Sequence, residues 1–110
     1  NKNGDAFSLR ICREDERSYL EKGKDKVLRL AKVWAAKEAA VKALGTGFSQ
    51  GITFNDIALR HNAVGRPELE FFGGALERLR QLTRGGSSNV FISLSDDKPF
   101  AQAVVIIEKM

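Results

Sequence analysis

The chain has 110 residues and a single cysteine, and it carries a net charge of +4 with a pI near 9.5. This length is enough for one domain with one hydrophobic core, and one cysteine excludes both an internal disulfide and a multi-cysteine metal site. No apolar run approaches the roughly 20 residues of a membrane-spanning helix, and the first residues lack the apolar core of a signal peptide. We therefore expect a cytoplasmic protein with no membrane partner. The basic charge favours an acidic or phosphate-rich partner, and cofactor phosphates, an acidic protein or nucleic acid would each satisfy it.

Two short elements are expected before residue 25. Apolar side chains alternate over residues 7–11, which fits either a short strand or one turn of helix. Residues 13–22 are mostly charged and predict a short helix that turns Tyr19 and Leu20 towards the core. Gly23 ends this helix.

The next stretch predicts one long helix. Residues 25–44 contain no Gly or Pro and are rich in Ala, Leu, Lys and Glu, which are strong helix formers. Gly45 should end the helix, because glycine adopts the left-handed cap conformation without penalty. Glu38 and Lys42 lie one turn apart, a spacing that usually marks a solvated pair worth about 0.2–0.5 kcal/mol to the helix. The apolar stripe recurs at three- and four-residue steps and comprises Val27, Leu30, Ala31, Trp34, Val41 and Leu44.

A hairpin and a second helix are predicted after the long helix. Residues 57–60 and 68–72 read as two strands, and the loop 62–67 joins them. Gly65 in this loop can take the positive φ that tight hairpin turns require. Residues 75–84 then predict a helix with a leucine at every third position.

The last two predicted strands form another hairpin. Residues 90–95 alternate, with aliphatic side chains at even positions and Phe or Ser at odd positions. Residues 96–99 turn the chain, and the continuous apolar run 104–107 within 100–108 predicts a strand buried on both faces or nearly so. Together these elements predict a single α+β domain over residues 1–110, with a mainly antiparallel sheet packed on the long helix.

One motif on the long helix resembles a known enzyme family. Residues 34–42, WAAKEAAVK, resemble the signature (F/W)-(A/S)-x-K-E-(A/S)-h-h-K of the 4′-phosphopantetheinyl transferases, and the Leu-Gly-Thr-Gly that follows at 44–47 resembles the small holo-acyl-carrier-protein synthase branch. Enzymes of this family transfer the 4′-phosphopantetheine arm of coenzyme A to a serine of an apo acyl-carrier protein and release 3′,5′-ADP. The resemblance implies a Mg²⁺-dependent transferase that forms a homotrimer, with coenzyme A as substrate. Its partner would be a carrier protein of fatty-acid or polyketide synthesis.

The resemblance also implies roles for individual residues. Glu38 would bind Mg²⁺, which prefers hard oxygen donors, and would help to deprotonate the incoming serine. Lys42 would stabilise charge on the pyrophosphate. Lys37 points about 100° away from Glu38 around the helix, so it would contact phosphate or partner, with a solvated surface lysine as the alternative. The other cofactor-binding residues implied by the resemblance are Gly45, Thr46 and Gly47, then Gly65, Arg66 and Pro67 at the hairpin tip, and Ser93 and Ser95 on a strand.

Several of these residues have a simpler interpretation. A helix cap explains Gly45, a plain hairpin turn explains Gly65 and Pro67, and an exposed strand face explains Ser95. Arg66 is not explained by a turn alone.

The chain departs from the family pattern in two places. The family begins with a strand G-x-D-h-(V/I)-E-h, whose aspartate is a second Mg²⁺ ligand, and residues 1–7 do not match it. We therefore expect the chain to start some twenty residues into the family's domain, with Asp5 or Asp96 as alternatives for the second ligand. Val33 stands where many relatives have arginine. A silent relative that binds coenzyme A or a carrier protein without turnover is therefore a second hypothesis.

A third hypothesis concerns RNA. Residues 37–44 faintly resemble the Ala- and Lys-rich helix of double-stranded RNA-binding domains. In that fold the helix follows three strands and ends the domain, whereas here the strands come after it. We therefore expect no nucleic-acid partner.

Overall fold

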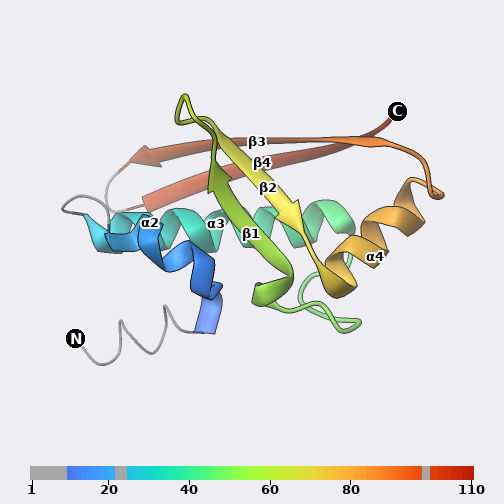
Figure 1. Ribbon diagram of the computed structural model, residues 1–110, viewed down its shortest axis with the longest axis horizontal. Helices are drawn as coiled ribbons and strands as arrows, with labels where there is room; N and C mark the ends of the chain where they lie inside the picture. The colour runs from blue at the N-terminus through green and yellow to red at the C-terminus, as the bar shows by residue number, and fades with distance from the viewer. Residues whose placement is uncertain (1–9, 22–24, 98–99) are drawn as a thin grey trace.

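The computed structural model describes residues 10–21, 25–97 and 100–110 of an α+β domain. The helix α3 (Lys26–Leu44) runs lengthwise with the hairpin β3–β4 beside it, and the hairpin β1–β2 crosses it (Figure 1). No helix in the described ranges is long and apolar enough to cross a membrane. The other elements are η1 (Glu14–Glu16), α2 (Arg17–Glu21), η2 (Phe54–Asp56), β1 (Ile57–His61), β2 (Pro67–Phe71), α4 (Gly73–Leu82), β3 (Ser88–Asp97) and β4 (Phe100–Lys109).

Both ends of α3 are capped, and the glycine cap at its C-terminus is the one that the sequence predicts. Asp25 is the N-cap, and its Oδ1 accepts a hydrogen bond from the Leu28 backbone N–H at 3.1 Å. At the other end Gly45 has a φ of 80° in the left-handed region, and its N–H donates to the Lys42 carbonyl at 3.0 Å. The predicted long helix and its glycine stop are confirmed.

The buried face of α3 differs from the predicted stripe. Val41 and Leu44 are buried as expected, but Val27 is 79% exposed and Trp34 is only partly buried. At 100° per residue the buried face is turned by about 80° from the predicted one. The buried face contains small residues, which let neighbouring strands approach closely, and one lysine. Its members are Val33, Ala36, Lys37, Ala40, Val41 and Leu44.

Two antiparallel hairpins pack on α3. In the first, β1 pairs with β2 so that Ile57 lies opposite Phe71; in the second, β3 pairs with β4 so that Ile92 lies opposite Val105. The first core cluster lies between α3, α4 and the first hairpin and contains Ala40, Val41, Leu44, Ile52, Ile57, Phe71 and Ala75. The second cluster holds the N-terminal segment and contains Ile11, Cys12, Leu20, Val33, Ala36 and Leu59.

The strand β4 corrects one expectation. It alternates between partly buried and exposed residues, so it is not buried on both faces. Val105 and Ile107 pack towards the first core cluster, whereas Val104 and Ile106 are 59% and 56% exposed. The hairpin β3–β4 packs on α3 through one face, and no other described element covers its outer face. Phe91 on β3, opposite Ile106, belongs to the same outer face and is 52% exposed.

Candidate functional site

Glu38 and Lys42 lie one turn apart on α3, turned away from the centre of its buried face. Glu38 is partly exposed and Lys42 is exposed. Neither side chain forms a hydrogen bond or an ion pair with another described residue, and the two do not pair with each other. The solvated Glu–Lys pair considered from the sequence is therefore not formed. The Glu38 carboxylate and the Lys42 ammonium group are therefore both available to bind a ligand at the surface.

The described residues around Glu38 could supply only part of the coordination shell of a Mg²⁺ ion. The carboxylate is a hard oxygen donor of the kind that Mg²⁺ uses. Within the described ranges, however, no group of three or more His, Cys, Asp or Glu residues could hold a metal. Of the two alternatives for a second ligand, Asp96 is already paired with Lys32 on α3 at 3.2 Å, and Asp5 lies outside the described residues. The described residues would thus supply one ligand, Glu38, and water and phosphate oxygens would complete the shell, which is usual for Mg²⁺.

The turn after α3 is tight and internally bonded. Gly47 has a φ of 59°, so like Gly45 it lies in the left-handed region that favours glycine. The N–H groups of Thr46 and Gly47 both donate to the Val41 carbonyl at 3.2 Å, and the Thr46 hydroxyl donates to the Gly47 carbonyl at 2.8 Å. Gly45 and Gly47 therefore leave two positions of this turn without side chains, and the Thr46 hydroxyl oxygen can accept a hydrogen bond from a ligand. The backbone N–H groups of the turn are already bonded within the chain, so they are not free donors.

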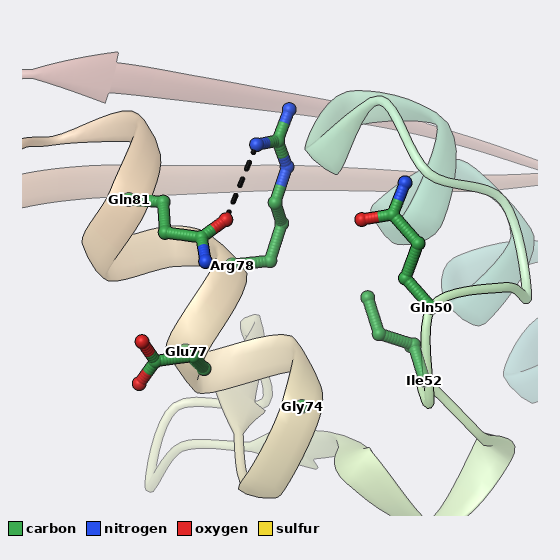
Figure 2. A pocket seen from close by; sticks show the side chains of 6 residues that line it. All are labelled: Gln50, Ile52, Gly74, Glu77, Arg78 and Gln81. Carbon is green, nitrogen blue, oxygen red and sulfur yellow. Dashed lines mark hydrogen bonds between the residues drawn. The ribbon is translucent and has the colours of Figure 1, made fainter.

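Arg78 of α4 supports this turn, although no sequence motif identifies it. Its Nε donates to the carbonyl of Leu44, the last residue of α3, at 2.9 Å. Its Nη1 donates to Gln81 Oε1 at 3.4 Å, as Figure 2 shows. A cation at a helix C-terminus is favoured by the helix dipole. The shallow pocket beside it is lined by Gln50, Ile52, Gly74, Glu77, Arg78 and Gln81.

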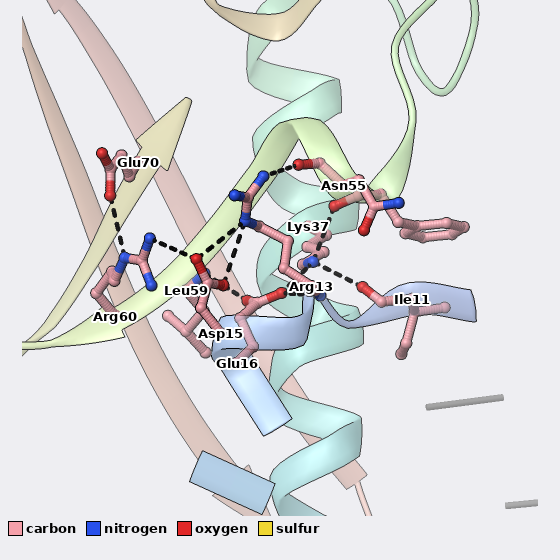
Figure 3. Close-up of polar contacts among 10 residues, drawn as sticks. Ile11, Arg13, Asp15, Glu16, Lys37, Asn55, Leu59, Arg60 and Glu70 are labelled. Atoms are coloured by element: carbon pink, nitrogen blue, oxygen red, sulfur yellow. Dashed lines mark hydrogen bonds and ion pairs between the residues drawn. The ribbon is translucent and has the colours of Figure 1, made fainter. Parts of the chain in front are cut away.

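Lys37 is fully buried. Its Nζ donates to Glu16 Oε1 at 2.5 Å, to the Ile11 carbonyl at 2.6 Å and to the Phe54 carbonyl at 2.9 Å (Figure 3). Both expectations for Lys37 are corrected by this burial. It lies in the middle of the buried face of α3, where three protein oxygens replace water, so it neither faces solvent nor reaches a phosphate outside the domain.

Glu16 is the partner that sequence reasoning missed. It is 2% exposed; its Oε1 also accepts the Arg13 N–H at 2.8 Å, and its Oε2 accepts the Leu59 N–H at 2.7 Å. Burial lowers the pKa of Lys37, and the charge of Glu16 opposes that shift. Twenty-one positions separate the two residues, and no local sequence pattern links them.

A more exposed set of ion pairs lies next to the buried pair. The Arg13 guanidinium donates to Asp15 and to the Asn55 carbonyl, and Arg60 bridges Asp15 and Glu70 at 3.1 and 3.0 Å (Figure 3). Exposed pairs of this kind add little to stability. They nevertheless join η1 to η2 and to the first hairpin.

The remaining predicted site residues lie elsewhere. Gly65 has a φ of 82°, and Arg66 beside it is exposed at the tip between β1 and β2, which Figure 1 shows well away from the turn after α3. Pro67 begins β2. Ser93 and Ser95 are exposed on the outer face of β3, whereas α3 packs on the inner face. One chain by itself therefore places Glu38 and Lys42 on α3 and the Gly45–Gly47 turn directly after it, but it does not bring the hairpin tip or the two serines to them.

Comparison with known families agrees with this fold and with the motif on α3. Residues 1–100 fit the model of the 4′-phosphopantetheinyl transferase superfamily. The chain belongs to this superfamily.

Within the superfamily the chain is similar to the holo-[acyl-carrier-protein] synthases. It is 46% identical to that of Gluconobacter oxydans, over 97% of this chain and 70% of the relative, and 42% identical to that of Phenylobacterium zucineum, over 97% and 78%. The predicted family and the predicted kind of enzyme are confirmed by these relatives.

Solved structures agree with the fold. The holo-[acyl-carrier-protein] synthase of Neisseria meningitidis matches with a TM-score of 0.81 and 39% identity, covering 98% of this chain and 84% of that one. The enzyme of Bacillus anthracis, solved in complex with CoA (3′,5′-ADP), matches with a TM-score of 0.78 and 33% identity, covering 99% and 85%. The predicted α+β class is thereby confirmed.

Proposed function

We propose that this chain transfers the 4′-phosphopantetheine arm of coenzyme A to a serine of an apo acyl-carrier protein, in a Mg²⁺-dependent reaction that releases 3′,5′-ADP. The similarity to the holo-[acyl-carrier-protein] synthases supports this proposal. The observation that carries it is the presence of Glu38 and Lys42, both unpaired with any described residue, one turn apart on the family's signature helix. A cytoplasmic location and a carrier protein of fatty-acid synthesis are part of the proposal.

The chemistry needs a base and a cation at the pyrophosphate. The serine oxygen attacks the phosphorus next to the pantetheine arm, the P–O bond to the nucleotide half breaks, and 3′,5′-ADP leaves with the electron pair. Glu38 takes the serine proton, directly or through a water molecule. The Lys42 ammonium compensates the charge that grows on the phosphate oxygens. A bound Mg²⁺ would neutralise the pyrophosphate and align it, with the Glu38 carboxylate as its protein ligand.

We further propose that the complete site forms between copies of the chain in a homotrimer. The predicted cofactor-binding residues of one chain lie on opposite faces of the β3–β4 hairpin, since Ser93 and Ser95 face away from α3. The apolar outer face of the same hairpin is uncovered in the single chain. A neighbouring copy would cover this face and would bring its own signature helix to the two serines.

The direct test is transfer to a purified apo acyl-carrier protein. With coenzyme A and Mg²⁺, the mass of the carrier should rise by one phosphopantetheine per molecule, and 3′,5′-ADP should appear in equal amount. A carrier whose acceptor serine is changed to alanine is the control. An unmodified carrier after long incubation with excess coenzyme A would contradict the proposal, and binding of coenzyme A without transfer would identify a silent relative.

A further inference from the structure

Lys37, one member of the buried Lys37–Glu16 pair, directly precedes the proposed metal ligand Glu38 in the sequence. The Lys37 ammonium has three N–H donors, and each has an acceptor: Glu16 Oε1, the Ile11 carbonyl and the Phe54 carbonyl. Both oxygens of Glu16 are occupied as well. Removing either partner would leave the other as an uncompensated buried charge, which proteins tolerate poorly. The pair therefore has one favourable arrangement.

This arrangement fixes the rotation of α3 about its own axis. The three acceptors come from the segment before η1, from η1 and from η2, so they define one position for Lys37 Nζ. Glu38 follows at a fixed angle of about 100° on the same helix. A carboxylate about 5 Å from the helix axis would move by about 2 Å if the helix turned by some 20°. Mg²⁺ demands near-ideal octahedral geometry, so its affinity should respond to such a displacement.

We propose that Lys37 and Glu16 are positioning residues, which set the direction in which Glu38 presents its carboxylate and thereby set the affinity for Mg²⁺. This inference rests on the proposed function, in which Glu38 binds Mg²⁺. Lys37 and Glu16 touch neither substrate nor metal. If the pair were merely structural, its removal would change only the stability of the domain. If the pair positions Glu38, its removal also lowers the affinity for Mg²⁺ relative to a variant of equal stability.

The chain supplies its own probe for the test. Trp34 is the only tryptophan, and it lies one turn before Glu38 on the same side of α3. Its fluorescence can be followed while Mg²⁺ is titrated into the full chain with coenzyme A present. Lys37→Met removes the ammonium group and keeps the aliphatic stem. We expect Lys37→Met to raise the half-saturating Mg²⁺ concentration at least tenfold, and to change coenzyme A binding without Mg²⁺ by less than about twofold.

Phe71→Leu is the matched control. Phe71 is buried in the first core cluster, which contains none of the residues that supply the three Lys37 acceptors, so its truncation weakens the core without disturbing the ion pair. It should lower the melting temperature yet leave the half-saturating Mg²⁺ concentration unchanged. Equal Mg²⁺ affinity in Lys37→Met and Phe71→Leu would overturn the positioning role. If Lys37→Met does not fold, the isosteric Glu16→Gln takes its place, with an expected increase of at least threefold and the same overturning result.

Glu38→Gln separates the two claims. If this variant binds Mg²⁺ as tightly as the unchanged chain does, the metal role of Glu38 is wrong and the positioning role fails with it. If Glu38→Gln weakens Mg²⁺ binding and Lys37→Met does not, only the positioning role is overturned. In the Glu38→Gln background, Lys37→Met should have no further effect on Mg²⁺ affinity, because the group that it positions is already gone.

Discussion

Lys37 and Glu38 are neighbours in the sequence with opposite surroundings. The helix turns Lys37 into the domain, where its ammonium group meets three protein oxygens, and turns Glu38 to the flank, where its carboxylate has no partner among the described residues. A charged side chain is almost never fully buried unless it is paired. Sequence reasoning therefore gave Lys37 an exposed role, since its partner Glu16 could be recognised only from the folded structure.

Cys12 provides a test of this buried environment. Burial, and then the charge of Glu16, raise the pKa of the Cys12 thiol from its ordinary value of 9.0 to about 11. At pH 8 the folded chain should therefore hold about 100-fold less thiolate than the unfolded chain. We expect alkylation of Cys12 by iodoacetamide to be slower by at least that factor in buffer than in denaturant. Comparable rates in the two conditions would show that the segment around Cys12 is not packed as described.

The same shift gives a stability effect whose sign is fixed. Because the folded chain holds the Cys12 proton more tightly, the thiolate favours the unfolded state. The contribution of Cys12 is fully present below pH 9 and is lost as the pH rises towards 11. A Cys12→Ser chain should lack this part of the alkaline loss of stability in denaturant titrations.

At the scale of elements, sequence patterns predicted what local chemistry determines. The glycine cap of α3, the alternation of β3 and both hairpins follow from residue types a few positions apart, and all are confirmed. The buried face of α3 was misplaced, because large apolar residues were taken to mark it, whereas Ala36 and Ala40 are what allow close packing. The expectation that both faces of β4 are buried was wrong, because an apolar run in the sequence does not show whether a second layer covers the outer face.

The turn after α3 allows a prediction at this scale. Gly45 has a φ of 80°, and a Cβ there would be only 3.6 Å from Arg78 Nη2, an ordinary contact. The cost of Gly45→Ala is therefore one of backbone conformation, about 1 kcal/mol. Chemical denaturation should show this loss with an unchanged m-value. No measurable loss for Gly45→Ala would mean that the left-handed cap is not needed.

At the scale of the whole molecule, the uncovered outer face of β3–β4 is the candidate interface of the proposed trimer. Phe91, Val104 and Ile106 are each more than half exposed, and Ile106 lies directly opposite Phe91. Contiguous exposed apolar patches usually mark interaction sites. We expect Val104→Asp, which places a charge in this patch, to convert the proposed trimer into monomers and to lower transfer by at least about tenfold.

Sedimentation at micromolar concentration measures this change. Val27→Asp is the control, because Val27 is 79% exposed on α3 and lies outside the patch. A wild-type chain that sediments as a monomer and is still fully active would contradict the shared site.

The central claim is that Glu38 and Lys42 carry the transfer reaction. The measurement that tests it most directly is the rate of phosphopantetheine transfer to an apo acyl-carrier protein at saturating Mg²⁺. The account predicts that Glu38→Ala and Lys42→Ala each slow transfer by at least about 100-fold, while the melting temperature stays within a few degrees, because neither side chain has a partner among the described residues. Glu14→Gln, at an exposed carboxylate on η1, should leave the rate unchanged. Near-normal transfer by folded Glu38→Ala would contradict the account.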